Sequence, residues 1–243
     1  GVFANWVATV QNTGLEAAIR GTVIRKKDLT INLYFNISRN FNKLIAYPNI
    51  ERSPYATRYK IGSSLSTNYY YNLLGVDPMT GLYVYEDYNK DGLLRNKAGV
   101  FPGTDGDDRY KAYDMAPRFQ GGFGGSIYWK GFGLDFNFSY INQLGMHPFF
   151  GVKPGSMKNL ILPDEMKNNH WRNPGDAVKY ARYTTSSSTN PVSPIDASFL
   201  RLNNLSLSYG LADKLVNKMG MQRCIVSVSA QNLFMLTAYT NDP

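Results

Sequence analysis

The stretch of sequence that decides the fold runs from Phe119 to Tyr140 and reads FQGGFGGSIYWKGFGLDFNFSY. Apolar side chains alternate with polar or small ones up to Trp129, and the alternation starts again at Phe132. Only a Lys-Gly dipeptide separates the two runs. Two runs of period two around so short a break predict an antiparallel β-hairpin.

The same alternation recurs in other stretches of the chain. Residues 15–23 and 29–37 flank the short break at Lys26–Asp28, and two more runs cover 200–209 and 224–230. The phase slips by one residue at Asn203-Asn204, which predicts a β-bulge. With a further hairpin expected near 59–72 and 81–88, the pattern predicts about eight strands. No charged residue falls on the apolar faces of the five cleanest runs, which are 15–23, 29–37, 119–129, 132–140 and 224–230.

The length and spacing of these runs favour a membrane-spanning sheet. Ten residues at a rise of about 3.3 Å, tilted by about 40°, cover about 25 Å, the height of the lipid-facing band of a barrel. The breaks are alternately very short and very long, the long ones being 40–117 and 143–197. Aromatic residues also gather near the ends of the runs. We therefore predict an all-β fold that is part of a large antiparallel transmembrane β-barrel.

Composition excludes several function classes. Charged residues make up 18% of the chain, against about 25% in an average soluble domain. The single cysteine, Cys224, excludes an internal disulfide and a cysteine-based zinc site. The net charge of +8 is scattered, and the polar strand faces carry mainly neutral Asn, Ser and Thr, so we expect no nucleic-acid partner. No catalytic motif is present, and we expect no enzyme activity and name no catalytic residue.

One loop has the spacing of a metal site. Asp87, Asn89 and Asp91, followed by Gly92, match the opening of an EF-hand loop, in which oxygens at positions one, three and five converge. The match fails at position twelve, where Ala98 replaces the usual glutamate. Calcium is therefore the one candidate cofactor, with a role in stiffening the loop, and an Asx-rich turn is the alternative.

The long breaks contain little regular periodicity. Six prolines and the run Ser186–Ser188 mark 143–197 as loop with short local structure. Residues 211–222 have the pattern of a short amphipathic helix that ends at Gly220. Loops as long as these are usually functional.

Two stretches near the end of the chain are distinctive, ASFLRLNNLSLSYGL at 197–211 and VSVSAQNLF at 226–234. Shorter ones precede them at 12–16, 75–83, 87–92, 117–122 and 171–176. In this order they resemble the C-terminal region of the SusC/RagA family of TonB-dependent outer-membrane transporters, with 12–16 as a strand entry, 75–83, 87–92 and 171–176 as loop signatures, and 117–122 as the stretch before a strand.

The resemblance implies a barrel of 22 strands in the outer membrane of a Gram-negative, Bacteroidota-like bacterium. It implies import of oligosaccharides or peptides, energised by TonB, with a SusD-like lipoprotein over the extracellular mouth. Residues 1–243 would then be the C-terminal portion of one barrel domain, surrounded by outer-membrane lipid, with extracellular loops near 40–117 and 143–197. The plug domain, the TonB-contacting segment and the last barrel strand would lie outside this chain. No substrate-binding residue is predicted.

Two other functions fit parts of the same pattern. A secreted, soluble β-sandwich that binds carbohydrate would also alternate apolar and polar residues, and could hold calcium at Asp87–Gly92. An assembly component could reuse the barrel without import. Dependence on detergent separates the sandwich from the barrel.

Overall fold

The computed structural model describes residues 8–95, 106–153, 155–157, 161–184 and 192–240. The chain divides into two compact units, which we describe separately. The sheet unit comprises residues 12–41, 116–144 and 196–243, and the loop unit comprises residues 1–11, 42–115 and 145–195. Neither helix in the described part of the chain is long and apolar enough to cross a membrane.

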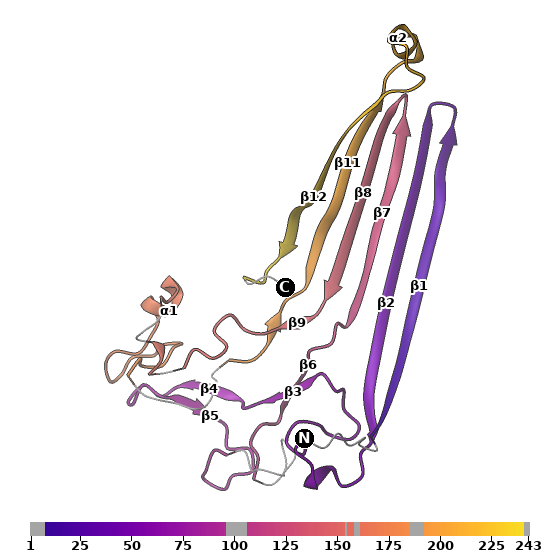
Figure 1. Cartoon of the computed structure of the whole chain (residues 1–243). Coiled ribbons are helices and arrows are strands. Elements are labelled where there is room, and N and C mark those ends of the chain that lie inside the picture. The colour runs from indigo at the N-terminus through magenta and orange to yellow at the C-terminus, as the bar shows by residue number, and fades with distance from the viewer. Residues whose placement is uncertain (1–7, 96–105, 154, 158–160, 185–191, 241–243) are drawn as a thin grey trace, which may run out of the picture. The chain divides into compact units, whose positions relative to one another are not determined.

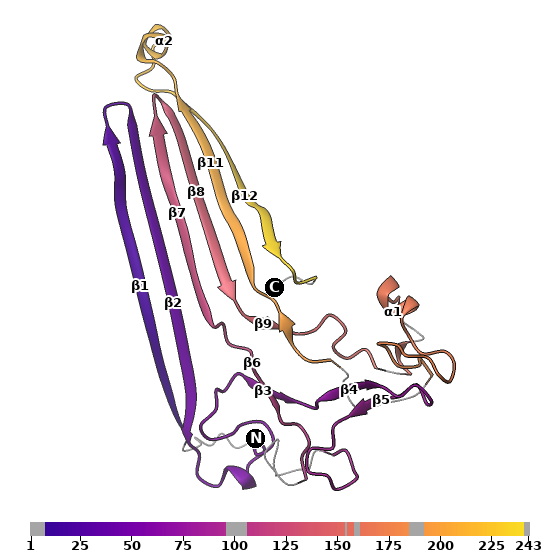
Figure 2. The same ribbon diagram turned by 180° about the vertical axis from the view of Figure 1, so that it is seen from behind.

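The sheet unit is built on one six-stranded sheet (Figure 1). Its strand order is β1-β2-β7-β8-β11-β12, and the view from behind in Figure 2 shows the same neighbours. Every pairing from β2 to β12 is antiparallel. The strands are β1 (Thr9–Lys26), β2 (Leu29–Ala46), β7 (Phe119–Trp129), β8 (Phe132–Asn142), β11 (Phe199–Gly210) and β12 (Ile225–Thr237).

The register puts the apolar runs of β2, β7, β8, β11 and β12 on one face of this sheet. Phe35 lies opposite Phe123, which in turn lies opposite Phe138, and Leu207 lies opposite both Leu134 and Val228. Because residues directly opposite each other in a sheet share a face, a continuous apolar surface results. The predicted bulge is confirmed, since the register of β11 shifts between Leu202 and Asn204 against both of its neighbours.

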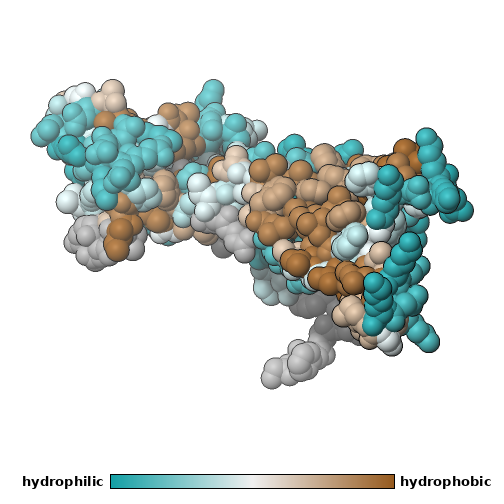
Figure 3. Space-filling view, turned by 90° about the horizontal axis from the view of Figure 1, so that it is seen from above, coloured by the Kyte–Doolittle hydropathy of each residue, from teal (hydrophilic) through white to brown (hydrophobic). Residues whose placement is uncertain are grey.

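The apolar face is exposed and not packed as a core. Leu15, Ile19 and Val228 are 74%, 71% and 71% exposed. Figure 3 shows the hydrophobic side chains as one broad area over the sheet, with hydrophilic residues along its edge. A surface of this extent, made of side chains that a soluble domain would bury, needs an apolar medium or partner to cover it.

The connections of the sheet are short at one end and long at the other. β1–β2 and β7–β8 are joined by tight turns, and at this same end β11 and β12 are joined through α2 (Asp213–Lys218). The predicted helix at 211–222 is thus confirmed, and Gly220 follows it with a φ of +70°. The opposite end gives rise to the two long segments, as the sequence indicated.

In its described residues, the loop unit contains short paired strands and two small buried clusters. Leu44, Tyr47 and Ile50 form one buried cluster, and Met157, Leu162, Met166 and Tyr180 form the other. The regular elements of the segments that supply this unit are η1 (Ile50–Arg52), β3 (Thr67–Tyr70) paired with β6 (Lys111–Asp114), β4 (Leu73–Val76) paired with β5 (Tyr83–Tyr85), α1 (Asp164–Asn168), and β9 (Leu144–Gly145) paired with β10 (Ile195–Asp196).

Two expectations about 40–117 are wrong. Residues 59–66 form no strand, because Tyr59 and Leu65 pack on the Leu44 cluster and a turn at Gly62 joins them. The hairpin of 59–72 with 81–88 is replaced by the β4–β5 pair and by β3 with β6. The loop also starts later than residue 40, since β2 continues to Ala46.

Candidate functional site

The polar face of the sheet carries hydrogen bonds that run across the strands. The hydroxyl of Thr22 on β1 donates to the Asn32 side-chain oxygen on β2 at 2.8 Å, and the Asn32 amide donates to Ser126 Oγ on β7 at 3.0 Å. The amide of Asn203 on β11 donates to Asn137 Oδ1 on β8 at 2.9 Å. Neutral side chains on five neighbouring strands thus join into a hydrogen-bonded surface.

A glycine allows this network to extend over a whole strand. Asn137 on β8 donates to the Tyr34 hydroxyl on β2 at 2.6 Å, although β7 lies between them. Gly124 is the residue of β7 opposite both partners. A Cβ at Gly124 would lie 2.5 Å from that hydroxyl, so only glycine leaves room for the ring to cross.

A shallow hollow of about 340 Å³ opens on the same polar face. One cation, Arg20, and one anion, Asp135, are among its lining residues, and the others are uncharged. A surface of this kind can form hydrogen bonds with water or with a polar solute. Because it carries one positive and one negative side chain, it does not favour solutes of one charge. The sequence indicated this face through its polar alternate positions, but the hollow itself went unpredicted. Its uncharged polar members are Asn32, Tyr34, Ser126, Asn137 and Asn204.

The apolar face carries aromatic rings near both of its ends. Phe132 packs against Tyr209 with ring centroids 4.5 Å apart and against Trp129 at 6.5 Å. At the other end, Tyr140 contacts the rings of Phe35 and Phe119. Aromatic rings at both ends of an apolar band are typical of a sheet that crosses a membrane between two interfaces.

Two of the sequence signatures, 75–83 and 171–176, pack against each other within the loop unit. The indole nitrogen of Trp171 and the backbone N–H of Gly175 each donate to the Pro78 carbonyl at 2.8 Å. The Trp171 ring covers Gly81, where an added Cβ would lie 2.4 Å from the indole. Gly81 also has a φ of +68°, a conformation that favours glycine. These residues are therefore structural, with the tryptophan closing over a glycine turn.

Aspartates fix the turns on both sides of this contact. Asp77 accepts backbone N–H groups from Met79 and Thr80, and these hydrogen bonds lower the pKa of its carboxyl group. Asp176 accepts backbone N–H groups from Asn173 and Arg172, which lower its pKa in the same way. Both carboxylates therefore act as local turn caps.

The structure brings Asp87, Asn89 and Asp91 together in one exposed loop. Asp87 accepts the backbone N–H groups of Asp91 and Gly92, and Asp91 pairs with Arg95. The pKa of Asp91 is lowered, mainly by that arginine. In the described ranges, no group of three or more His, Cys, Asp or Glu side chains is placed to hold a metal. The geometry is that of an Asx-rich turn, and calcium at this loop stays a prediction.

Asp108 holds the same loop in place through hydrogen bonds to its backbone. Its carboxylate is fully buried and accepts backbone N–H groups from Tyr88 and Arg95 at 2.9 Å. The neighbouring buried Asp107 pairs with Arg109. Asp107 and Asp108 are thus internal anchors.

We expect Asp108→Ala to loosen residues 87–95 selectively. Burying two or more N–H groups without an acceptor costs about 1–3 kcal/mol each. Hydrogen exchange of the full-length protein in detergent should show faster exchange in this loop, with the sheet unit unchanged. Asp164→Ala is the matched control, because the Asp164 side chain is 87% exposed. Equal effects of the two substitutions would contradict the anchoring role.

Further titratable groups of the loop unit make local contacts. Lys179 and the Tyr180 hydroxyl both donate to Glu165, which lowers the pKa of that carboxyl group. Burial lowers the pKa of His147, and the ring of His170 stacks on Tyr183 at 4.0 Å. We interpret these contacts as structural contacts within the loop unit.

Comparison with known proteins gives relatives over nearly the whole chain, although no family model matches. The chain is 26% identical over 268 residues to TonB-dependent receptor P3 of Formosa agariphila, covering 96% of this chain and 25% of that protein. It is 25% identical over 284 residues to TonB-dependent receptor P39 of the same organism, covering 96% of this chain and 27% of that protein. The chain thus spans about a quarter of the length of these relatives.

Solved structures show the same fold. The RagAB peptide transporter matches with a TM-score of 0.75 and 23% identity, covering 97% of this chain and 27% of that chain. The open-open state of the RagAB peptide importer matches with a TM-score of 0.73 and 23% identity, covering 97% of this chain and 26% of that chain. The relatives are named as receptors and transporters, and none of these names is that of an enzyme. This chain is therefore similar in sequence to TonB-dependent receptors and in fold to the RagAB peptide transporter, over about a quarter of the length of those proteins.

Proposed function

We infer that the chain is part of an outer-membrane importer that takes up oligosaccharides or peptides with energy from TonB. The observation that carries this proposal is the pair of opposite faces on one sheet of long strands. One face is apolar, exposed and free of charge in its alternating runs, and the other is hydrogen-bonded and polar. Lipid suits the first face, and a water-filled lumen suits the second.

The partners follow from the resemblance and the comparisons. The RagAB structures are of a peptide transporter, which supports a peptide as one of the two substrate classes. The sequence resemblance supports a SusD-like lipoprotein over the extracellular mouth, with the long loops contacting it or the substrate. The exposed apolar face disfavours the soluble sandwich, because nothing in the described residues covers it.

Fractionation of the native full-length protein tests this proposal. We expect it in the outer-membrane fraction, retained through a carbonate wash that strips peripheral proteins, and released only by detergent. A SusD-like lipoprotein should copurify, and glycans and peptides can then be screened on that complex. Recovery of the protein in the water-soluble fraction would contradict the barrel and make the calcium-dependent sandwich the working hypothesis.

A further inference from the structure

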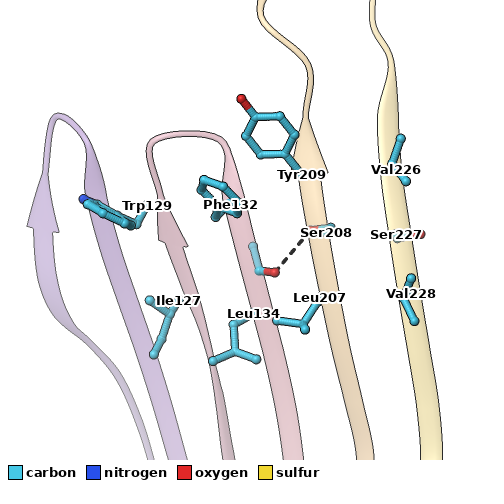
Figure 4. Close-up of a pocket in the computed structure, with 11 residues that line it drawn as sticks. Ile127, Trp129, Phe132, Leu134, Leu207, Ser208, Tyr209, Val226, Ser227 and Val228 are labelled. Carbon is cyan, nitrogen blue, oxygen red and sulfur yellow. Dashed lines mark hydrogen bonds between the residues drawn. The ribbon is translucent and has the colours of Figure 1, made fainter.

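The end of the sheet next to the tight turns has two hollows with different linings. One is an apolar groove of about 750 Å³, shown in Figure 4, which Trp129, Phe132 and Leu207 help to line. The other measures about 400 Å³ and has polar and charged residues in its lining. One row of that lining, paired across four neighbouring strands, consists of Thr30, Tyr128, Gly133 and Ser208.

This row belongs to the polar face of the sheet. Two residues further from the turns, the same four strands present another row of paired residues, which consists of Asn32, Ser126, Asp135 and Ser206. Because side chains alternate along a strand, the two rows share one face. The smaller hollow therefore opens on the face for which we propose a water-filled lumen.

Three glycines leave the space for this hollow. Gly131, Gly133 and Gly210 all line it, and the backbone N–H of Gly210 donates to the Gly131 carbonyl at 2.8 Å. A Cβ at Gly133 would lie 2.4 Å from Ser208 Oγ, and Figure 4 shows that hydroxyl bonded to the Gly133 carbonyl at 3.5 Å. A Cβ at Gly210 would meet only the Gly131 carbonyl oxygen, at 3.8 Å. A larger side chain at position 210 therefore fits and would fill the hollow.

Three separate connections each contribute a cation to the lining. Lys27 comes from the β1–β2 turn, Lys130 from the β7–β8 turn, and Arg223 from the segment between α2 and β12. The Lys130 ammonium group lies 5.7 Å from the centroid of the Trp129 ring. With Asp28 as the acidic member, three positive charges against one negative charge leave a net charge of +2. Across the described residues, none of these three cations forms an ion pair.

The connections around the hollow have the same sign of charge. In segments 24–30, 129–132 and 211–224, cations outnumber acids by seven to two. The hollow further from the turns, by contrast, is lined by one cation and one anion, Arg20 and Asp135. A solute that moves along the polar face toward the turns thus passes from a neutral surface to a positive one, which attracts anions.

We propose that the hollow is an anion site at the exit of the lumen, which binds a sulfate, phosphate or carboxylate group of the imported solute. The Arg223 guanidinium group offers paired donors for such a group, and Lys27 and Lys130 add point charges. The hydroxyl groups of Thr30 and Tyr128 supply further donors.

The proposal rests on the proposed function and narrows its substrate class. Short turns of such barrels face the periplasm, so the hollow lies where an imported solute leaves the lumen. The solute is then an acidic oligosaccharide or an acidic peptide. A phospholipid headgroup does not fit, because the polar face offers no apolar surface for its acyl chains.

Lysine acetylation of the full-length protein in an uncharged detergent tests the site residue by residue. The reagent is uncharged, and mass spectrometry gives the rate at each lysine. The probes are a disulfated disaccharide and the dipeptide Glu-Glu, with maltose and Gln-Gln as controls of zero net charge. An acidic probe at about twice its Kd should slow acetylation of Lys27 and Lys130 about threefold, and the controls should not. Lys26 and Lys214, which do not line the hollow, should keep their rates.

Two variants that remove the same charge separate the hollow from general attraction. Arg223→Gln should raise the probe concentration needed to protect Lys27 and Lys130 about tenfold, the usual effect of losing one charged hydrogen bond. Lys218→Gln removes a charge at the same end but outside the lining, and should change that concentration less than about twofold because salt screens distant charges. Gly210→Leu fills the hollow without changing charge and should abolish the protection.

Equal effects of Arg223→Gln and Lys218→Gln, or equal protection by maltose, would overturn the proposal. The same holds if Lys27 and Lys130 react far more slowly than Lys26 without any probe, since a segment of the protein itself would then cover the hollow. If the protein is membrane-bound and neither acidic probe protects the two lysines, only this inference fails. Recovery of the protein in the water-soluble fraction would instead contradict the proposed function, and the exit role with it.

Discussion

Gly81→Ala is expected to destabilise the loop unit by roughly 3 kcal/mol, a large effect for the addition of one methyl group. Two causes combine at this position. A non-glycine residue at a φ of +68° costs about 1–2 kcal/mol. The methyl group would also lie 2.4 Å from the Trp171 ring, so the indole must move and lose its hydrogen bond to Pro78. Hydrogen exchange of the full-length protein should be faster in 75–83 and 171–182 together.

Gly92→Ala is the control that isolates the backbone cost. Gly92 has a φ of +82°, but a Cβ there would meet no atom within 4 Å. Its substitution should therefore cost only the free energy of the unfavourable backbone conformation. Hydrogen exchange in 171–182 should be unchanged. In a double-mutant cycle, Gly81→Ala should cost less in a Trp171→Ala background. Equal effects of Gly81→Ala and Gly92→Ala would show that Gly81 is not required for the contact between the two signatures.

The sheet could be predicted because its signal is local. Side chains alternate with a period of two, so a one-residue slip moves every following residue to the other face and is visible in sequence. For that reason both tight hairpins and the bulge at 203–204 were predicted correctly. In contrast, β3 pairs with β6 across some forty residues, and neither strand is longer than four. Short, distant partners carry no periodicity that would identify them.

The candidate site was predictable only as a face. The polar alternate positions indicate which face of the sheet is in contact with water, but they do not indicate which side chains contact each other. Tyr34 reaches Asn137 across a whole strand because Gly124 lacks a side chain, a contact that no spacing in the sequence encodes. The roles of Gly81 and Trp171 were missed for the same reason, since the two residues meet only in the folded loop unit. The sequence resemblance located their segments, and the structure supplied the contact.

Leu205→Arg is expected to have the second large effect, on insertion into the bilayer. Leu205 lies opposite Phe136 and Ala230, midway between the aromatic ends of the apolar face. An arginine on the lipid face near the midplane of a barrel costs about 2–4 kcal/mol. Ser206→Arg, one residue later on the polar face, should cost far less because its side chain meets water. Urea titration of the full-length protein in lipid vesicles measures both values.

Arginine substitutions at two depths along the apolar face distinguish a lipid environment from a protein core. Tyr209 belongs to the aromatic cluster at the tight turns, where an arginine can reach headgroups and water. Tyr209→Arg should therefore cost only about 0–1 kcal/mol, apart from the lost ring contact with Phe132. In a soluble sandwich, both positions would be buried against a second sheet, and the cost would not fall toward the strand end. Similar large losses at Leu205 and Tyr209 would thus contradict the membrane-spanning sheet, whereas a steep decrease from Leu205 to Tyr209 requires a bilayer.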